Sequence, residues 1–226
     1  MHFATDLANF LACRHITALD RAAKAGEISR DFYGDPGLKL LKELGLRHEQ
    51  AYLSELQSQG RTVVTIPTEN TPWSDAADLT REAMRDGVDV IYQATFMDGD
   101  WGGRADFLMR VATASSLGNW SYEAVETKLA HSTKARALIQ LCLYSELIAT
   151  IQGREPNCMH VVLGDGAAPK QFAVQRYSPS FERLNATLKP QSRQKLKHTQ
   201  NQLSTVQFAI GIGSAMTVGT TMTISP

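Results

Sequence analysis

The sequence lacks several features that would assign it to a class of proteins at once. Its 226 residues include only three cysteines, Cys13, Cys142 and Cys158, which are far apart and form no CxxC pair. An odd and scattered set of cysteines argues against a disulfide framework and against a structural zinc site. The N-terminus has no basic segment followed by an apolar one, so we expect no secretory signal. These absences predict a cytoplasmic protein with reduced thiols.

Long hydrophobic runs and an excess of one charge are also missing. The best apolar candidate, residues 208–219, is short and interrupted by Gly211, Gly213 and Ser214, whereas a membrane span needs about 20 apolar residues. We therefore expect no membrane partner. The 23 basic residues are balanced by 23 acidic ones. A net charge of zero excludes a surface that is basic throughout and binds nucleic acid everywhere. It is compatible with a local basic channel, because net charge does not report how the charges are distributed.

Helical and strand-like patterns are interleaved over most of the chain. Helical spacing occupies residues 5–25, 38–59, 76–86 and 132–152, and strand-like segments occupy residues 62–67, 88–96, 104–111, 120–129, 159–163 and 171–177. This order predicts an α/β sandwich in which helices flank a central mixed β-sheet. From about residue 185 the character changes, and residues 201–226 are rich in Thr, Ser and Gly without periodicity. We expect one domain over residues 1–184 and a poorly ordered tail over 185–226.

Two neighbouring predicted strands carry a candidate catalytic set. Asp106 lies in the segment GRADFL, and Glu126-Thr127-Lys128 follows 20 residues later. Strand alternation points Glu126 and Lys128 the same way, and pairing of the strands would bring Asp106 close to Glu126. Two such carboxylates stay ionised together only with a cation between them, and Mg²⁺ or Mn²⁺ suits their oxygen ligands. With Lys128 to stabilise negative charge, this set predicts phosphodiester hydrolysis, although a solvated strand edge is the alternative.

Three segments together resemble a known family of nucleases. GRADFL, YEAVETKLA and ALIQLCLYSEL are similar to the RecB-like branch of the PD-(D/E)xK nucleases. The resemblance implies a restriction-endonuclease-like sandwich, with Gln140 and Tyr144 on the following helix in DNA binding and in shaping the site. Arg104, beside Asp106, is a further candidate for phosphate contact, and the alternative is a pair with a surface acid.

The same resemblance implies an additional metal ligand upstream. The branch carries a histidine on an earlier helix, and Gly45-Leu46-Arg47-His48-Glu49 is similar to that segment. His48 is therefore the expected ligand, and Glu49 is the alternative, as in other branches. Some RecB-like relatives also bind an iron–sulfur cluster through one upstream and three downstream cysteines. Only Cys158 follows the motif helix here, so we predict no cluster.

Residues 3–184 as a whole are especially similar to a bacterial family of RecB-like nucleases. In that family the nuclease domain usually begins a longer protein, and a helicase or a further nuclease-like segment can follow it. Residues after about 185 depart from the family, for which our hypothesis is a truncated or frame-shifted gene. The leading prediction is a divalent-metal-dependent deoxyribonuclease or exonuclease that acts on DNA in preference to RNA. The alternatives are a catalytically inactive nucleic-acid-binding module and a plain structural α/β domain.

Overall fold

The computed structural model describes residues 2–29 and 36–188. Their elements, in chain order, are β1 (His2–Phe3), α1 (Ala4–Ala12), α2 (Arg14–Lys24), α3 (Pro36–Ser58), β2 (Val63–Thr65), α4 (Trp73–Asp86), β3 (Val90–Asp98), β4 (Trp101–Val111), β5 (Ser121–Lys128), α5 (Ala135–Gln152), β6 (Cys158–Leu163), β7 (Lys170–Ala173) and α6 (Val174–Leu188). Of the poorly ordered tail that we expected over residues 185–226, residues 185–188 are the end of α6, and the rest lies outside the described residues.

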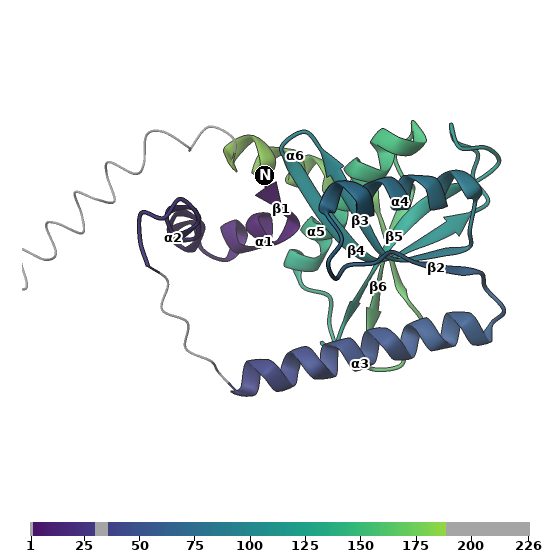
Figure 1. Ribbon diagram of the computed structural model, residues 1–226, viewed down its shortest axis with the longest axis horizontal. Coiled ribbons are helices and arrows are strands. Elements are labelled where there is room, and N and C mark those ends of the chain that lie inside the picture. The colour runs from purple at the N-terminus through teal and green to yellow at the C-terminus, as the bar shows by residue number, and fades with distance from the viewer. Residues whose placement is uncertain (1, 30–35, 189–226) are drawn as a thin grey trace, which may run out of the picture. The chain divides into compact units, whose positions relative to one another are not determined.

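The strands form one mixed sheet in the order β2-β3-β4-β5-β6-β7, and β1 pairs with β4. The β2–β3, β5–β6 and β1–β4 pairs are parallel, whereas β3–β4, β4–β5 and β6–β7 are antiparallel. Helices α3 and α4 lie on opposite sides of this sheet (Figure 1). The prediction of an α/β fold with a mixed sheet flanked by helices is therefore confirmed.

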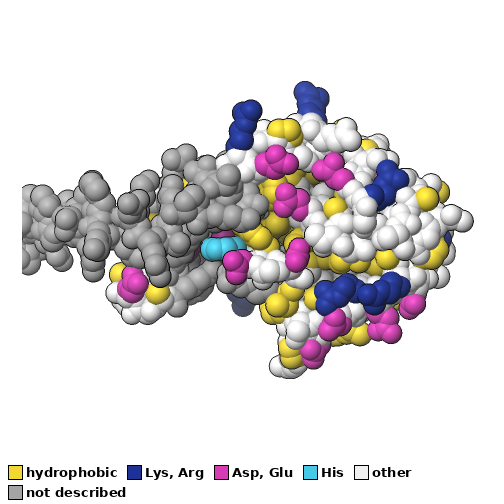
Figure 2. All heavy atoms as spheres, turned by 90° about the horizontal axis from the view of Figure 1, so that it is seen from above, with side chains coloured by type: hydrophobic (Ala, Val, Ile, Leu, Met, Phe, Trp, Pro, Cys, Tyr) yellow, Lys and Arg dark blue, Asp and Glu magenta, His cyan; other side chains and the backbone are white. Residues whose placement is uncertain are grey.

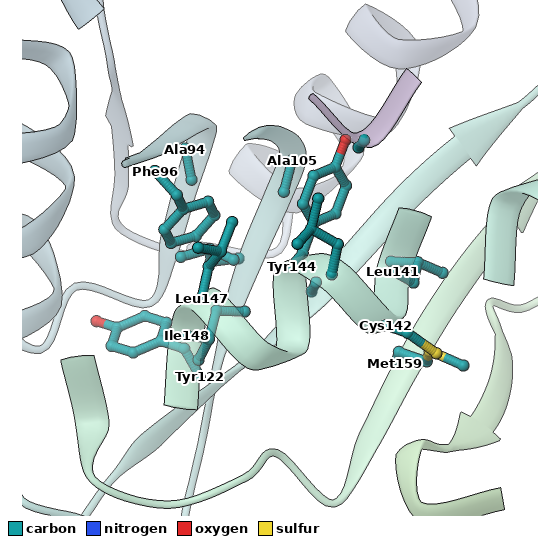
Figure 3. Packing of buried hydrophobic residues seen from close by; sticks show 14 of the residues in the cluster. Ala94, Phe96, Ala105, Tyr122, Leu141, Cys142, Tyr144, Leu147, Ile148 and Met159 are labelled. Carbon is teal, nitrogen blue, oxygen red and sulfur yellow. The ribbon is translucent and has the colours of Figure 1, made fainter. Parts of the chain in front are cut away.

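Each face of the sheet has its own hydrophobic core. The larger core gathers buried side chains from α1, α4, α5 and α6, and Figure 3 shows part of it, with Leu147 and Ile148 of α5 beside Phe96 and Tyr122. The smaller core lies on the α3 side and is centred on Phe107, with Leu56 of α3 packed into it. Burial on both faces is what a strand sequence with nearly continuous apolar character requires.

Only the second half of α3 packs against the sheet. Tyr52 and Leu53 contact the smaller core and Leu56 is 3% exposed. The leucines of the first half are exposed instead: Leu38, Leu40, Leu41, Leu44 and Leu46. The helical pattern over residues 38–59 therefore predicted the helix correctly, but apolar spacing alone did not separate its packed half from its exposed half.

Two sequence predictions were wrong in detail. The single helix expected over residues 5–25 is two helices, because Cys13 has an extended backbone with φ of −162° and ψ of 113°. This break lets α2 fold back on α1, where Asn9 donates a hydrogen bond to Asp20 at 3.4 Å. The strand expected over residues 171–177 ends at Ala173 and α6 begins at the next residue. Val174 and Phe181 are both buried, at a spacing of seven that also suits two helical turns.

Within the described residues, no helix is long and apolar enough to cross a membrane. The three cysteines are free thiols.

Candidate active site at the fork between β4 and β5

The candidate site lies where two neighbouring strands of the sheet separate. The β4–β5 ladder runs from Val111 paired with Ser121 to Phe107 paired with Val125, and it ends there. Further along, β4 pairs with β1 through Trp101 and Gly102. Because β3 lies along the other edge of β4, residues 103–106 have no strand partner on the side where β1 ends and β5 begins to pair. We call this place the fork.

Asp106 is held at the fork by the residue between Glu126 and Lys128. Its Oδ2 atom accepts the backbone N–H of Thr127 at 2.7 Å and the Thr127 hydroxyl at 2.8 Å. Because β5 continues to pair with β6 up to Lys128, the position of Thr127 is fixed by the sheet. Asp106 is therefore fixed beside the Glu-Thr-Lys segment, and its Oδ1 atom takes no part in either bond.

Glu126 is a buried carboxylate in an unfavourable setting. The residue is 4% exposed, its Oε1 atom accepts a hydrogen bond from Lys128 Nζ, and its Oε2 atom is buried without a hydrogen-bond partner. Burial and, next, the charge of Asp106 raise the pKa of Glu126 to about 8, although Lys128 opposes this rise. Without a further cation, Glu126 is therefore protonated over much of the neutral range.

Lys128 stays charged despite its setting. Burial lowers the pKa of Lys128, but the carboxylates of Glu126 and Asp106 raise it by more, so its net shift is upward. The side chain is partly exposed and reaches Glu126 from the same strand. The fork thus combines two carboxylates and one persistent ammonium group, which is the set that the sequence predicted to converge.

A third carboxylate joins the fork from α3. Glu49 is half-buried and receives a hydrogen bond from Gln93 Nε2. Burial and, next, the charge of Asp106 raise the pKa of Glu49. His48, in contrast, places its Nε2 atom 3.4 Å from the carbonyl oxygen of Val162 on β6. Of the two candidate ligands on this helix, Glu49 is thus the one that is electrostatically coupled to Asp106.

Gln140 and Tyr144 approach from α5, and both are buried, with exposed fractions of 7% and 3%. The Tyr144 ring packs against β4 at Gly103, where a Cβ atom would come within 2.7 Å of Cε1, and Figure 3 shows the ring beside Ala105. Burial and, next, the charges of Glu126 and Asp106 raise the pKa of Tyr144 well above its usual value. Side chains this deeply buried offer little surface to a substrate.

Arg104 carries a positive charge next to the fork. Its Nε atom donates to Thr95 Oγ1 at 3.1 Å, and its guanidinium carbon lies 4.7 Å from the centroid of the Trp73 ring. Burial lowers the pKa of Arg104. Within the part of the chain that the structure describes, no ion pair joins Arg104 to a carboxylate. Of the two roles considered for it, an anion contact fits this setting better than a surface ion pair.

The residues of the fork fit a divalent cation in chemical type. Mg²⁺ and Mn²⁺ prefer carboxylate oxygens, and the partnerless Oε2 atom of Glu126 beside Asp106 is an atom that a cation would satisfy. No group of three or more His, Cys, Asp or Glu side chains among residues 2–29 and 36–188 is already arranged around a common metal position. Binding would therefore draw the side chains of Glu49, Asp106 and Glu126 closer together.

A second polar cluster, which the sequence did not reveal, crosses β5 and β6. Glu123 Oε2 lies 2.7 Å from His160 Nε2, and Glu123 Oε1 accepts the backbone N–H of Cys158 at 3.0 Å. The sequence alone gives no reason to pair His160 with an acidic residue. Its carboxylate partner is 37 residues away in the sequence, and only the parallel pairing of the two strands brings them together.

Comparison with known proteins does not identify a relative. No protein-family model matches the chain, and no curated protein matches its sequence. The assignment of a function therefore depends on the chemistry of the fork itself. Residues that the sequence did not mark, above all Thr127, Gln93 and Trp73, contribute to that chemistry by holding Asp106, Glu49 and Arg104.

Proposed function

We propose that the protein is a divalent-metal-dependent nuclease that hydrolyses phosphodiester bonds, in DNA rather than RNA. One observation carries the proposal. Glu126 is buried beside Asp106 with one oxygen lacking any partner, and Lys128 alone does not compensate for the repulsion. Nothing in packing explains why the buried carboxylate of Glu126 lies beside the half-buried carboxylate of Asp106, because burying such charges costs stability unless a cation joins them. A site that is unfavourable until it binds metal is typical of a functional centre.

Each residue of the fork has a distinct task in this proposal. Asp106 and Glu126 would hold the cation, and Glu49 would supply the third carboxylate in place of His48, whose ring is turned toward Val162. When bound, the cation would neutralise charge on the scissile phosphate and make a water molecule a stronger nucleophile. Lys128 would stabilise the negative charge that develops on the phosphate oxygens.

Substrate would be placed by residues around the fork. Arg104, held flat by Trp73 and by Thr95, can present its remaining N–H groups to a backbone phosphate. Gln140 and Tyr144 would act indirectly, by fixing the wall against which Glu126 lies. On the face shown in Figure 2, acidic and basic side chains are interspersed with hydrophobic ones. Affinity for DNA would therefore depend on a few well-placed cations and would fall with added salt.

We also propose the family of the protein and the compartment in which it acts. A mixed sheet with acidic residues at a fork between two strands supports a PD-(D/E)xK sandwich of the RecB-like branch. The three free thiols fit a reducing compartment such as the cytoplasm. A helicase that delivers DNA to the fork is the partner that fits a nuclease of this branch.

The decisive experiment compares DNA cleavage by the wild-type protein and by two lysine variants. Labelled single-stranded and double-stranded DNA would be incubated with Mg²⁺, with Mn²⁺ or with EDTA. Lys128→Ala removes the ammonium group of the fork. Lys170→Ala is the matched control, because it removes an exposed lysine from the edge strand β7. We expect metal-dependent cleavage that Lys128→Ala lowers by about 100-fold or more and that Lys170→Ala leaves unchanged.

The outcomes separate the competing functions. Cleavage that persists in EDTA, or that both lysine variants retain, would exclude the fork as the metal-dependent site. Binding of DNA by the wild-type protein without any cleavage would favour the catalytically inactive binding module. Neither binding nor cleavage would leave a structural α/β domain as the remaining interpretation.

A further inference from the structure

One residue of β3 departs from strand geometry directly opposite Asp106. Gln93 has a φ of +59°, in the left-handed region that residues with a side chain rarely adopt. The ladder between β3 and β4 is regular on either side, but the pair that Gln93 and Asp106 would form is absent from it. The irregular residue therefore lies at the fork and not in a peripheral turn.

The left-handed conformation turns two neighbouring side chains toward one carboxylate. Consecutive residues of a regular strand point to opposite faces of the sheet. Here, however, the Gln93 side-chain amide donates a hydrogen bond to Glu49 on α3, and the side chain of the preceding residue, Tyr92, interacts with the same carboxylate. A regular backbone at Gln93 would turn its amide away from α3 and would remove this hydrogen bond.

Glu49 needs such support because its surroundings are mostly repulsive. The carboxylates of Asp106 and Glu126 both interact unfavourably with its charge, and only Lys128 among these groups attracts it. An unsupported glutamate on a helix surface would swing toward solvent, away from these charges. The neutral amide of Gln93 fixes the carboxylate without adding positive charge that would compete with a metal ion.

We propose that Gln93 is a positioning residue of the fork, whose left-handed backbone aims its side-chain amide at Glu49 and so holds that carboxylate ready to bind the cation. The inference rests on the metal-dependent function proposed above. Backbone strain of this kind persists where the surrounding structure uses it. Glycine would adopt the same conformation without strain, so the amide is the reason for glutamine at this position.

The test uses a variant that keeps the backbone conformation and removes the amide. Gln93→Gly does this, and Asn70→Gly is the matched control, because Asn70 has a φ of +54° in an exposed segment between β2 and α4. Three quantities would be measured for each protein: unfolding in urea, Mn²⁺ affinity by titration calorimetry, and the dependence of DNA cleavage on Mn²⁺ concentration.

We expect Gln93→Gly to be at least as stable as the wild type while its Mn²⁺ affinity falls by about 10-fold. Saturating Mn²⁺ should restore its cleavage rate, and its affinity for DNA should not change, because the residue acts through Glu49 alone. Asn70→Gly should match the wild type in Mn²⁺ affinity. A residue with a purely structural role would lose stability and leave the Mn²⁺ dependence unchanged.

Either of two results would overturn the inference about Gln93 without touching the proposed function. One is an unchanged Mn²⁺ affinity in Gln93→Gly, and the other is a loss of stability that accounts for the loss of activity in this variant. In both cases the wild type still binds Mn²⁺ and cleaves DNA, so the proposed function stands. A wild-type protein that neither binds Mn²⁺ nor cleaves DNA would overturn the proposed function and, with it, the role of Gln93.

Discussion

Asp106 accepts both the backbone N–H and the hydroxyl of Thr127, at 2.7 Å and 2.8 Å, and so replaces the strand partner that Thr127 lacks at the fork. The same arrangement occurs near the surface, where Thr62 donates its N–H at 3.0 Å and its hydroxyl at 2.8 Å to Asp89. The two pairs share these two bonds and differ in location, and the Thr62 hydroxyl in addition accepts the backbone N–H of Asp89 at 3.1 Å. The second pair is therefore a natural control for the first.

Removal of the Thr127 hydroxyl should impair activity more than stability. Thr127→Val keeps the shape of a side chain that is 7% exposed and preserves the backbone hydrogen bond. One of the two bonds that orient Asp106 is lost, so we expect cleavage to fall by about 10-fold and the free energy of unfolding to fall by about 1–2 kcal/mol.

Thr62→Val is the control for this substitution, because it removes the equivalent bond to Asp89 in an exposed setting. Its cleavage rate should equal that of the wild type. Equal losses of activity in both variants would show that the Thr127 hydroxyl serves folding and not the orientation of Asp106.

The buried Glu126 should make stability depend on pH in the absence of metal. Its pKa is about 8 in the folded protein and 4.5 is its ordinary value, so between these values the folded state holds a proton that the unfolded state has released. The free energy of unfolding should therefore decrease as pH rises from about 5 to 9. Glu126→Gln cannot ionise and lacks this decrease, so its stability relative to the wild type should increase by about 4 kcal/mol over that range.

Urea denaturation in EDTA at pH 5, 7 and 9 would measure this difference. Mg²⁺ should reverse the order at high pH, because the cation stabilises the ionised wild-type carboxylate and has less to bind in the variant. Stability curves that run parallel across the whole pH range, with or without metal, would contradict the assignment of the raised pKa to Glu126.

Much of the fold could be predicted from the sequence because its pattern is local. The central strands and the helix that becomes α5 have strong periodicity, and their predicted bounds agree with the structure to within a few residues. Local pattern did not predict the break at Cys13 or the beginning of α6 at Val174. Both depend on tertiary contacts, since the break lets α2 return to α1 and Val174 is buried by the fold around it.

Part of the candidate site could likewise be predicted from the sequence, and part of it could not. Strand alternation was enough to place Asp106 near Glu126 and Lys128, because that argument needs only two adjacent strands. The support of Glu49 by Gln93 could not be predicted, because the residues are 44 positions apart and the contact requires a left-handed backbone within a strand. Likewise, no sequence pattern connects Arg104 with Trp73, which meet only through the packing of α4 near β4.

The packing of Tyr144 against Gly103 gives a further prediction about the wall of the fork. A Cβ atom at residue 103 would lie 2.7 Å from Tyr144 Cε1, closer than side chains approach, and the ring is 3% exposed with little room to move. Gly103→Ala should therefore displace Tyr144 and lower the free energy of unfolding by about 1–3 kcal/mol. Cleavage should fall as well, because Tyr144 is part of the wall beside Glu126.

Gly45→Ala is the matched control, since a Cβ atom there meets nothing within 4 Å and the residue lies inside α3. Alanine is favoured over glycine within a helix, so this variant should gain about 0.5–1 kcal/mol of stability and should cleave DNA at the wild-type rate. Denaturation in urea would measure the change in stability of both variants.

If Gly103→Ala were as stable as the wild type, the Tyr144 ring would have to be mobile, and it could not form a fixed wall on the α5 side of the fork. If Gly103→Ala lost stability but kept full activity, Tyr144 would contribute only to the hydrophobic core. The proposal that Gln140 and Tyr144 help to shape the site would then be wrong.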